Sequence, residues 1–243
     1  KGIAKPEDIT GSDKFEEARK RAGERFGINI AEDNKSVAAG SDVLILAVKP
    51  QMLSEVTAEI PGSIGKDTLI ISSIAGRTIA QLEEAFGKSA KIVRCMPNTP
   101  AMVGAGCSGV CRSEAVSEEE MKQCLGLLSS FGIAEEVPEK IMDAVVGVSG
   151  SSPAYVFMFI EAMADGAVKA GMPRAQAYRF AAQAVMGSAK LMLETGKHPG
   201  ELKDMVCSPA GTTIEAVQVL EEMGFRSAVM DAVEACVEKS RNL

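Results

Sequence analysis

The first half of the chain alternates short apolar runs with segments of helical periodicity. We expect strands at 8–11, 28–30, 42–48, 68–73 and 91–96, and helices at 15–26, 35–39, 51–59 and 79–86. The run 42–48 is apolar after its first residue, which is typical of a parallel strand buried on both faces. This alternation predicts an α/β domain with a parallel sheet and right-handed crossovers.

The pattern changes near Lys140, where strand signals stop and long helical segments follow. We expect helices at 154–170, 174–194, 200–206, 212–222 and 225–241, separated by Gly and Pro residues. The segments 155–160 and 181–186 are apolar around nearly their whole circumference, which indicates helices that are buried. A helical domain of this size has too little interior for them, so we expect partner helices from a second subunit.

Composition narrows the class of protein. The chain has a formal net charge of -7, with 46% hydrophobic and 24% charged residues, which is typical of a soluble folded protein and disfavours nucleic-acid binding. No run of about 18 apolar residues is present, so no membrane span is expected. The N-terminus resembles neither a signal peptide nor a transit peptide.

The cysteine pattern disfavours a metal site. Six cysteines lie among apolar neighbours, with no CxxC pair and one histidine in the chain, so no zinc site of the usual Cys/His type is expected. We interpret the cysteines as reduced and buried, as in a cytoplasmic protein.

Turns that follow strands are the first candidates for a site, because ligands of open parallel sheets bind beyond the carboxyl ends of the strands. Ser12, Asp13 and Lys14 follow the first strand. An acidic residue there favours a ribose diol and a Lys beside a Ser favours a 2′-phosphate, so the coenzyme preference stays open. A plain turn in which Ser12 or Asp13 caps the next helix is the alternative.

The turn at 47–50 follows the most apolar strand, and Pro50 suits the first position of the next helix. An ordinary turn with an exposed Lys49 is the alternative. In the segment 95–100, two prolines within four residues stiffen the backbone and leave Asn98 and Thr99 as polar groups beyond a strand end. That rigidity favours a functional segment over a flexible linker between domains.

Two further segments lead into helices. The small residues of 148–154, with Pro153 in the first turn, favour a helix start whose amides bind an anion or a carbonyl group, or a plain helix start. The segment 208–213 is the strongest candidate for a binding site. It places hydroxyls and free amides at a helix start suited to a carboxylate, and its residues are Ser208, Gly211, Thr212 and Thr213. Thr212 can also act as a cap. His198, just before another helix, is interpreted as a surface or capping residue.

Together these segments resemble the pyrroline-5-carboxylate reductases over nearly the whole chain. The stretches that carry the resemblance are 47–50, 96–100, 148–154, 208–213 and the tail 224–235. The resemblance implies a Rossmann-type dinucleotide-binding domain over 1–139 and a helical dimerisation and substrate domain over 140–243. It also implies homodimers that assemble into larger rings, and reduction of Δ1-pyrroline-5-carboxylate to L-proline with NADPH or NADH.

The resemblance also implies residue roles. The residues expected near the adenosine ribose are Ser12, Asp13 and Lys14. Those expected to line the dinucleotide and the nicotinamide are Ala47, Lys49, Pro50, Met96, Pro97 and Asn98. Those expected to hold the substrate carboxylate and ring nitrogen are Ser208, Gly211, Thr212 and Thr213, with Thr213 as the catalytic hydroxyl nearest the imine.

One family feature is not in the sequence. The family's first strand and its G-x-G-x-x-G/A turn are expected to precede Lys1, because residues 1–4 have the pattern of a helix end. Two alternatives remain. A β-hydroxyacid dehydrogenase needs a catalytic Lys with an Asn one helical turn later, and here Lys169 is followed by Pro173. The other alternative is a non-catalytic remnant without the coenzyme loop, which only dimerises or binds a carboxylate ligand.

Overall fold

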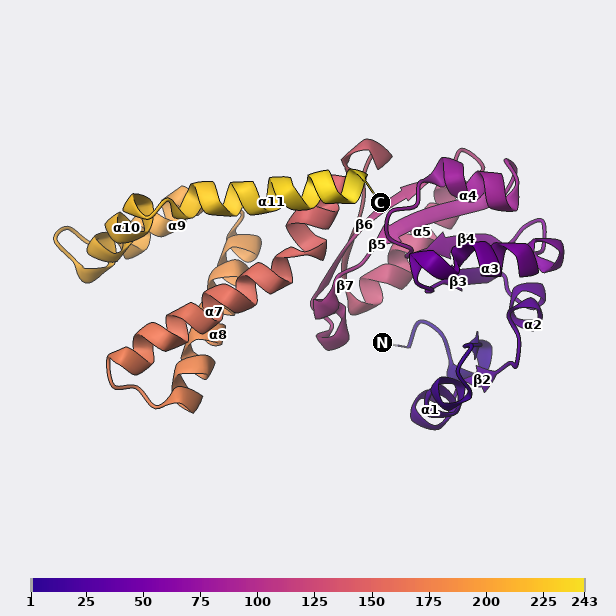
Figure 1. Ribbon diagram of the computed structural model, residues 1–243, viewed down its shortest axis with the longest axis horizontal. Coiled ribbons are helices and arrows are strands. Elements are labelled where there is room, and N and C mark those ends of the chain that lie inside the picture. Colours follow the sequence, from indigo (N-terminus) through magenta and orange to yellow (C-terminus); the bar gives the residue numbers. More distant parts are fainter. Residues whose placement is uncertain (1, 243) are drawn as a thin grey trace. The chain divides into compact units, whose positions relative to one another are not determined.

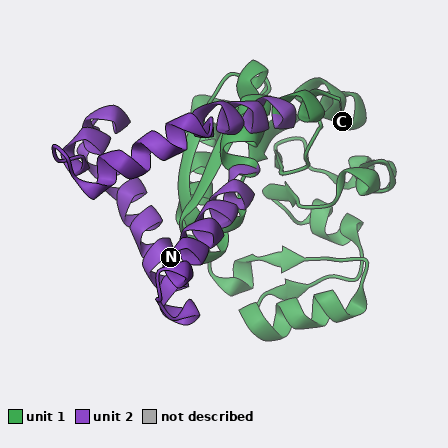
Figure 2. Ribbon diagram, turned by 60° about the vertical axis from the view of Figure 1, so that its left-hand side comes forward, with its two compact units in different colours: residues 1–150, 237–243 green, residues 151–236 purple. Residues whose placement is uncertain are grey.

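The computed structural model describes residues 2–242 and divides into two compact units (Figures 1 and 2). Unit 1 comprises Lys1–Gly150 and Val237–Leu243, and unit 2 comprises Ser151–Cys236. The chain therefore passes between the units twice, once at Gly150–Ser151 and once at Cys236–Val237.

Unit 1 is built on a five-stranded sheet with the order β3-β4-β5-β6-β7. The strands are β3 (Val43–Leu46), β4 (Leu69–Ser72), β5 (Lys91–Met96), β6 (Gly106–Arg112) and β7 (Gly132–Glu136). β3, β4 and β5 run parallel, as the sequence predicts, while β6 is antiparallel to β5 and parallel to β7. A separate parallel pair joins β1 (Thr10–Gly11) to β2 (Asn29–Ile30).

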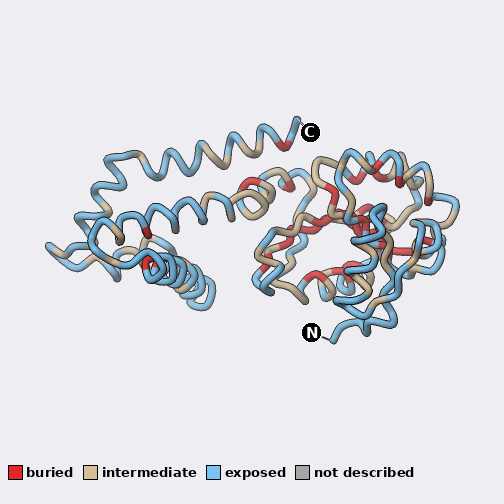
Figure 3. The backbone as a smooth tube through the Cα atoms, turned by 60° about the horizontal axis from the view of Figure 1, so that its bottom comes forward, coloured by how far each residue is buried: buried red, intermediate tan, exposed pale blue. Residues whose placement is uncertain are grey.

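Helices cover both faces of this sheet. On the five-stranded sheet they are α2 (Asn34–Ala39), α3 (Leu53–Glu59), α4 (Ile79–Phe86), α5 (Glu118–Leu128) and α6 (Met142–Val145). α1 (Glu16–Phe26) packs instead on β2 of the separate pair. Alternate residues of β4 point to opposite faces of the sheet. Ile70 packs with Leu53 and Leu82 on one face. Ile71 packs with Met121 and Leu128 on the other. Buried residues accordingly gather along the strands of unit 1 (Figure 3).

The expectation for 42–48 is wrong in one respect. Leu44 and Leu46 are buried, but Val43 is 41% exposed and Ile45 54% exposed. β3 is the edge strand of its sheet, and successive side chains of a strand point to opposite faces. Within residues 2–242 only the face carrying Leu44 and Leu46 is covered, so the strand is not buried on both faces.

The sequence pattern missed β6, α5 and β7. β6 reads Gly-Cys-Ser-Gly-Val-Cys-Arg, without the β-branched alternation that signals a strand. Its glycines are required by close packing, because a Cβ on Gly109 would lie 2.7 Å from Val145 Cγ1. The sheet is therefore mixed at this edge, where only parallel strands were expected.

Unit 2 is all helical, which confirms the predicted fold class. Its helices are α7 (Ser152–Lys169), α8 (Arg174–Thr195), α9 (Pro199–Val206), α10 (Thr212–Glu222) and the greater part of α11 (Phe225–Arg241). Its buried apolar cluster consists of Ala164, Ala177 and Ala181. Large apolar side chains such as Phe157, Phe180 and Leu193 are exposed, as expected for a surface that binds a partner.

One described helix is long and apolar enough to cross a membrane, although the sequence count predicted none. It runs through 31 residues, Glu139–Lys169, and includes α6, the π-helical turn η7 (Val146–Gly150) and α7. Only the length and the composition of this helix suggest a membrane span. A helix that packs on a partner subunit has the same properties.

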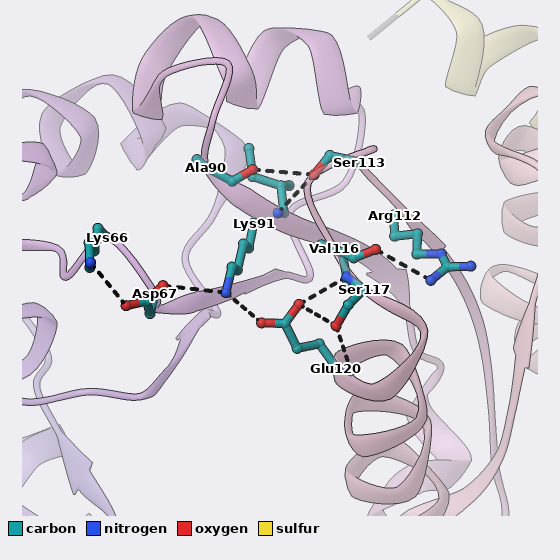
Figure 4. A network of polar contacts seen from close by, with 10 residues as sticks. Lys66, Asp67, Ala90, Lys91, Arg112, Ser113, Val116, Ser117 and Glu120 are labelled. Carbon is teal, nitrogen blue, oxygen red and sulfur yellow. Dashed lines mark hydrogen bonds and ion pairs between the residues drawn. The ribbon is translucent and has the colours of Figure 1, made fainter.

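A polar network lies at the amino ends of β4 and β5 (Figure 4). Lys91 Nζ lies 2.7 Å from Glu120 Oε1 and 3.7 Å from Asp67 Oδ1. The other carboxylate oxygen of Glu120 accepts hydrogen bonds from the amide and the hydroxyl of Ser117, which caps α5. Lys91 and these donors lower the pKa of Glu120 from 4.5 to about 2. The network joins the amino ends of β4 and β5 to the start of α5.

This lowered pKa predicts a pH dependence of folding. A carboxyl group with a depressed folded-state pKa stabilises the fold above its unfolded pKa, near 4.5, and this contribution is lost as the pH falls toward 2. Urea unfolding of Glu120→Gln should show a shallower loss of stability between these pH values than the parent protein, and a cost of about 1–2 kcal/mol at neutral pH. Glu119→Gln, at an exposed neighbouring position, is the matched control. Equal pH slopes in the parent and Glu120→Gln would contradict this assignment.

Candidate functional site

The carboxyl ends of the parallel strands β3, β4 and β5 meet at one edge of unit 1. The amide and the hydroxyl of Ser73, just after β4, both donate to Leu46 O at the end of β3, at 3.0 and 3.1 Å. Lys49 and Arg77 follow the same two strands, and no ion pair to either is seen within residues 2–242. This edge therefore offers two cations beyond the strand ends, where parallel sheets bind ligands. Ser73 and Arg77 were not predicted from the sequence, although Ser73 directly follows the apolar strand β4 and Arg77 lies in the turn between β4 and α4.

The turn after β1 is held by its own polar side chains. Ser12 Oγ donates to Asn34 Oδ1 at 2.7 Å, and Asn34 Nδ2 donates to Glu59 Oε2 at 2.9 Å. Asp13 Oδ1 accepts from the amide of Phe15 at 2.8 Å, so the turn that the sequence offered as an alternative is present. The cap that went with it is wrong, because α1 has Phe15 in its cap position and no side-chain hydrogen bond there. Asn34 was not singled out from the sequence, because only folding brings it to Ser12.

Lys14, the third residue of this turn, is exposed. Its ammonium lies 3.2 Å from Glu55 Oε1. An incoming phosphate would therefore compete with a carboxylate for this cation.

The segments 96–100 and 148–154 are brought together in unit 1. Asn98 Nδ2 donates to Ser149 O at 3.0 Å, and Asn98 Oδ1 accepts from Cys107 N at 2.9 Å. A Cβ on Gly150 would lie 3.2 Å from Met96 Cε. Two of the predicted motifs, more than fifty residues apart in sequence, therefore form one contact.

The helix start predicted in 148–154 is confirmed, because α7 begins at Ser152 with Ser151 in the cap position and Pro153 in the first turn. No side-chain hydrogen bond caps it, and the π-helical turn η7 at 146–150 leads directly into it, so its first turn is not preceded by a loop. A π-helical turn is rare and frequently lies at a functional site, which is a second reason to include this segment in the candidate site.

The residues of 208–213 gather at the start of α10. The amide of Gly211 donates to Ser208 O at 3.0 Å, which closes a tight turn. Within residues 2–242, Ala210 has the one positive φ of a non-glycine residue, 55°. A Cβ on Gly211 would collide with Ser208 Oγ, so that hydroxyl lies against the helix start.

α10 begins at Thr212, with Gly211 in the cap position and no side chain hydrogen-bonded there. The alternative in which Thr212 caps the helix is therefore wrong, because Thr212 lies inside the first turn. Thr213 is half-buried and Thr212 is exposed. In the described chain the first turn of α10 thus keeps backbone donors and two hydroxyls available to an anion.

His198 caps α9, since its Nδ1 accepts from the amide of Gly200 at 3.1 Å. The capping interpretation is confirmed.

The cysteines agree with the sequence interpretation in part. All six are free, and Cys95, Cys111 and Cys124 are buried. Burial raises the pKa of the Cys95 thiol to about 12 and those of Cys111 and Cys124 to about 11, which makes these thiols unreactive. The expectation that every cysteine is buried is wrong for the half-exposed Cys107, Cys207 and Cys236.

Known proteins with the same sequence pattern identify the family. Residues 139–243 match the family model described as pyrroline-5-carboxylate reductase dimerisation, and residues 1–76 match the one described as NADP oxidoreductase, coenzyme F420-dependent. The pyrroline-5-carboxylate reductase of Escherichia coli (strain K12) is 58% identical over 220 residues, which cover 90% of this chain and 82% of that protein. The chain belongs to the pyrroline-5-carboxylate reductase family. The reductase of Methanosarcina acetivorans is 48% identical over 242 residues, with 100% of this chain and 90% of that protein covered.

Solved structures of pyrroline-5-carboxylate reductases share the fold. The enzyme from Coxiella burnetii is 32% identical with a TM-score of 0.91, covering 98% of this chain and 88% of that chain. The enzyme from Plasmodium falciparum, solved with NADP bound, is 33% identical with a TM-score of 0.89, covering 99% and 89%. Membership of the reductase family removes the β-hydroxyacid dehydrogenase alternative.

Proposed function

We propose that this protein reduces Δ1-pyrroline-5-carboxylate to L-proline with hydride from NADPH or NADH, the last step of proline biosynthesis. The observation that carries the proposal is the agreement in sequence with pyrroline-5-carboxylate reductases over at least 90% of the chain.

We assign the coenzyme to the carboxyl edge of β1, β3, β4 and β5. A relative of known structure binds NADP, and this edge holds the hydroxyl, amide and cationic groups that suit ribose and phosphate. Ser12, Asp13 and Lys14 are assigned to the adenosine ribose, where Asn34 joins them through its bond to Ser12. The residues assigned to line the dinucleotide and nicotinamide are Ala47, Lys49, Pro50, Met96 and Pro97. Asn98, expected with them, lies in the same segment but uses both ends of its side-chain amide within the protein.

We assign the substrate carboxylate to the first turn of α10. Ser208, Gly211 and Thr212 surround the backbone donors there, and the partial positive charge of the helix end favours an anion. The Thr213 hydroxyl is half-buried on the same turn and is assigned to the ring nitrogen of the imine, as the catalytic residue.

This arrangement needs little acid–base chemistry from the protein. The reduced nicotinamide supplies a hydride, which forms the new C–H bond at C5 while the electron pair of the C=N double bond moves to the protonated nitrogen. The contribution of the chain is to hold the carboxylate on α10 and to orient the nitrogen with Thr213, so that the bound imine has one orientation. Positioning of this kind accounts for a large part of catalysis.

We further propose a cytoplasmic homodimer, assembled through the helices of 140–243 and able to form a larger ring. The exposed Phe157, Phe180 and Leu193 support such an interface, and so does the family match of residues 139–243. The six free cysteines are compatible with a reducing compartment.

The experiment that tests the reaction follows reduced-nicotinamide absorbance with the full-length protein. Oxidation of NADPH or NADH that depends on added Δ1-pyrroline-5-carboxylate supports the proposal. The same assay with 1-pyrroline, which lacks the carboxylate, should show a much higher KM because the anion contact to α10 is gone. No substrate-dependent oxidation with either coenzyme would refute the proposed function and favour a dimerising protein without catalysis.

A further inference from the structure

Asn98 uses both ends of its side-chain amide within the protein. It follows β5 directly, is half-buried, and donates through Nδ2 to Ser149 O at 3.0 Å. Its Oδ1 accepts from Cys107 N, the second residue of β6, at 2.9 Å. One side chain thus joins the end of β5, the start of β6 and the π-helical turn η7.

The bond to Ser149 fills a gap in the helix. A carbonyl in an α-helix accepts from the amide four residues later, which for Ser149 is Pro153, and proline has no N–H. The next amide, that of Ala154, donates to Ser151 O at 3.0 Å. The Asn98 side chain therefore supplies the donor that the helix itself cannot, and it does so beside a π-helical turn.

The bond to Cys107 closes a loop. Residues 99–105 leave β5 and return to β6, and the amide of Ala105 donates to Pro100 O at 3.1 Å. Gly106 has no room for a side chain, because a Cβ there would lie 2.9 Å from Ala101 Cβ. Met102 and Val103, 90% and 82% exposed, form the tip of the loop. Asn98 thus holds the base of a loop whose tip is uncovered in this chain.

We propose that Asn98 is a positioning residue, which fixes the segment Met96–Asn98 against the π-helical turn and does not donate its amide to coenzyme or substrate. The inference rests on the proposed function for its kinetic consequence. If this segment lines the nicotinamide, the two hydrogen bonds of Asn98 fix the residues that contact the ring, while Asn98 itself makes no contact with it.

Three variants test the proposal: Asn98→Ala, Asn98→Asp and, as control, Asn29→Ala. Asn29 also donates its amide to a backbone carbonyl, Glu7 O at 2.7 Å, but lies in β2. Asn98→Ala should lower kcat about tenfold while the coenzyme Kd stays within about threefold, because geometry and not a ligand contact is lost. Asn29→Ala should leave both unchanged.

Asn98→Asp gives a pH signature that a purely structural loss would lack. Its carboxylate keeps an acceptor for Cys107 N but offers no hydrogen to Ser149 O, whereas the protonated acid is again a donor. Its kcat relative to the parent protein should therefore rise as the pH falls from about 6 toward 4, where an aspartate with its usual pKa of about 3.9 begins to be protonated. Amide hydrogen exchange at Cys107 should be slow in the parent and Asn98→Asp and fast in Asn98→Ala.

Two results would overturn the proposal. Loss of coenzyme affinity as large as the loss of kcat would mean that Asn98 binds the coenzyme directly. Unchanged exchange at Cys107 in Asn98→Ala would mean that the hydrogen bond holds nothing in place. The exchange measurement needs no catalysis, so a parent protein without reductase activity would refute the proposed function and leave this test intact.

Discussion

Thr213→Ala is expected to lower kcat/KM for Δ1-pyrroline-5-carboxylate by roughly 10- to 100-fold. Thr213 lies half-buried in the first turn of α10, where we assign its hydroxyl to the imine nitrogen. A buried polar partner left without its hydrogen bond costs about 1–3 kcal/mol, and the loss appears in transition-state binding. Steady-state kinetics with saturating coenzyme measures this directly.

Two controls accompany the Thr213 variant. Thr213→Ser keeps the hydroxyl and should retain most of the activity. Thr195→Ala removes a hydroxyl that bonds Leu191 O at the end of α8 and should not change kcat/KM. Undiminished catalytic efficiency in Thr213→Ala would remove Thr213 from the proposed mechanism.

Gly132→Ala is expected to destabilise unit 1 by more than about 3 kcal/mol, near the top of the range for single substitutions. Gly132 opens β7 and pairs with Gly106 of β6. A Cβ at Gly132 would overlap the backbone O, C and N atoms of Gly106. Those atoms cannot move away without breaking the pairing of the two strands, so the clash has no inexpensive relaxation.

Urea unfolding of Gly132→Ala tests this clash, with Gly126→Ala as the matched control. Gly126 is exposed within α5, and a Cβ there meets nothing within 4 Å. This variant should be stabilised by about 1 kcal/mol, because alanine favours a helix over glycine. Insoluble or unfolded Gly132→Ala agrees with the expectation, and a midpoint equal to that of the parent protein would contradict it.

The sequence predicts those parts of the fold that depend on local pattern. The boundaries of α4, α10 and α11 follow from helical spacing with Thr, Gly and Arg residues at their ends, and the parallel β3, β4 and β5 follow from continuous apolar runs. β6 was not predictable in this way. β6 packs closely against α6 and the neighbouring loop, so small residues are needed there, for example Gly109 against Val145. Such contacts between distant parts of the chain cannot be seen in the local pattern of a strand.

Some residues of the candidate site were predictable from local sequence, and others were not. The hydroxyls and glycine of 208–213 are neighbours in sequence, so their cluster at the start of α10 was predictable. Asn34 beside Ser12 was not, because only pairing of β1 with β2 brings them together. The role of Asn98 was also hidden, since Ser149 lies 51 residues later and its missing donor follows from the helix running on through Pro153.

The central claim is that hydride passes from the coenzyme to C5 of Δ1-pyrroline-5-carboxylate. The most direct test is to incubate the full-length protein with NADPH, and in parallel with NADH, each carrying two deuterium atoms at C4, and to analyse the amino acid formed by mass spectrometry. The account predicts L-proline with one deuterium, located at C5. Coenzyme oxidation without deuterated proline, or no proline at all, would contradict it.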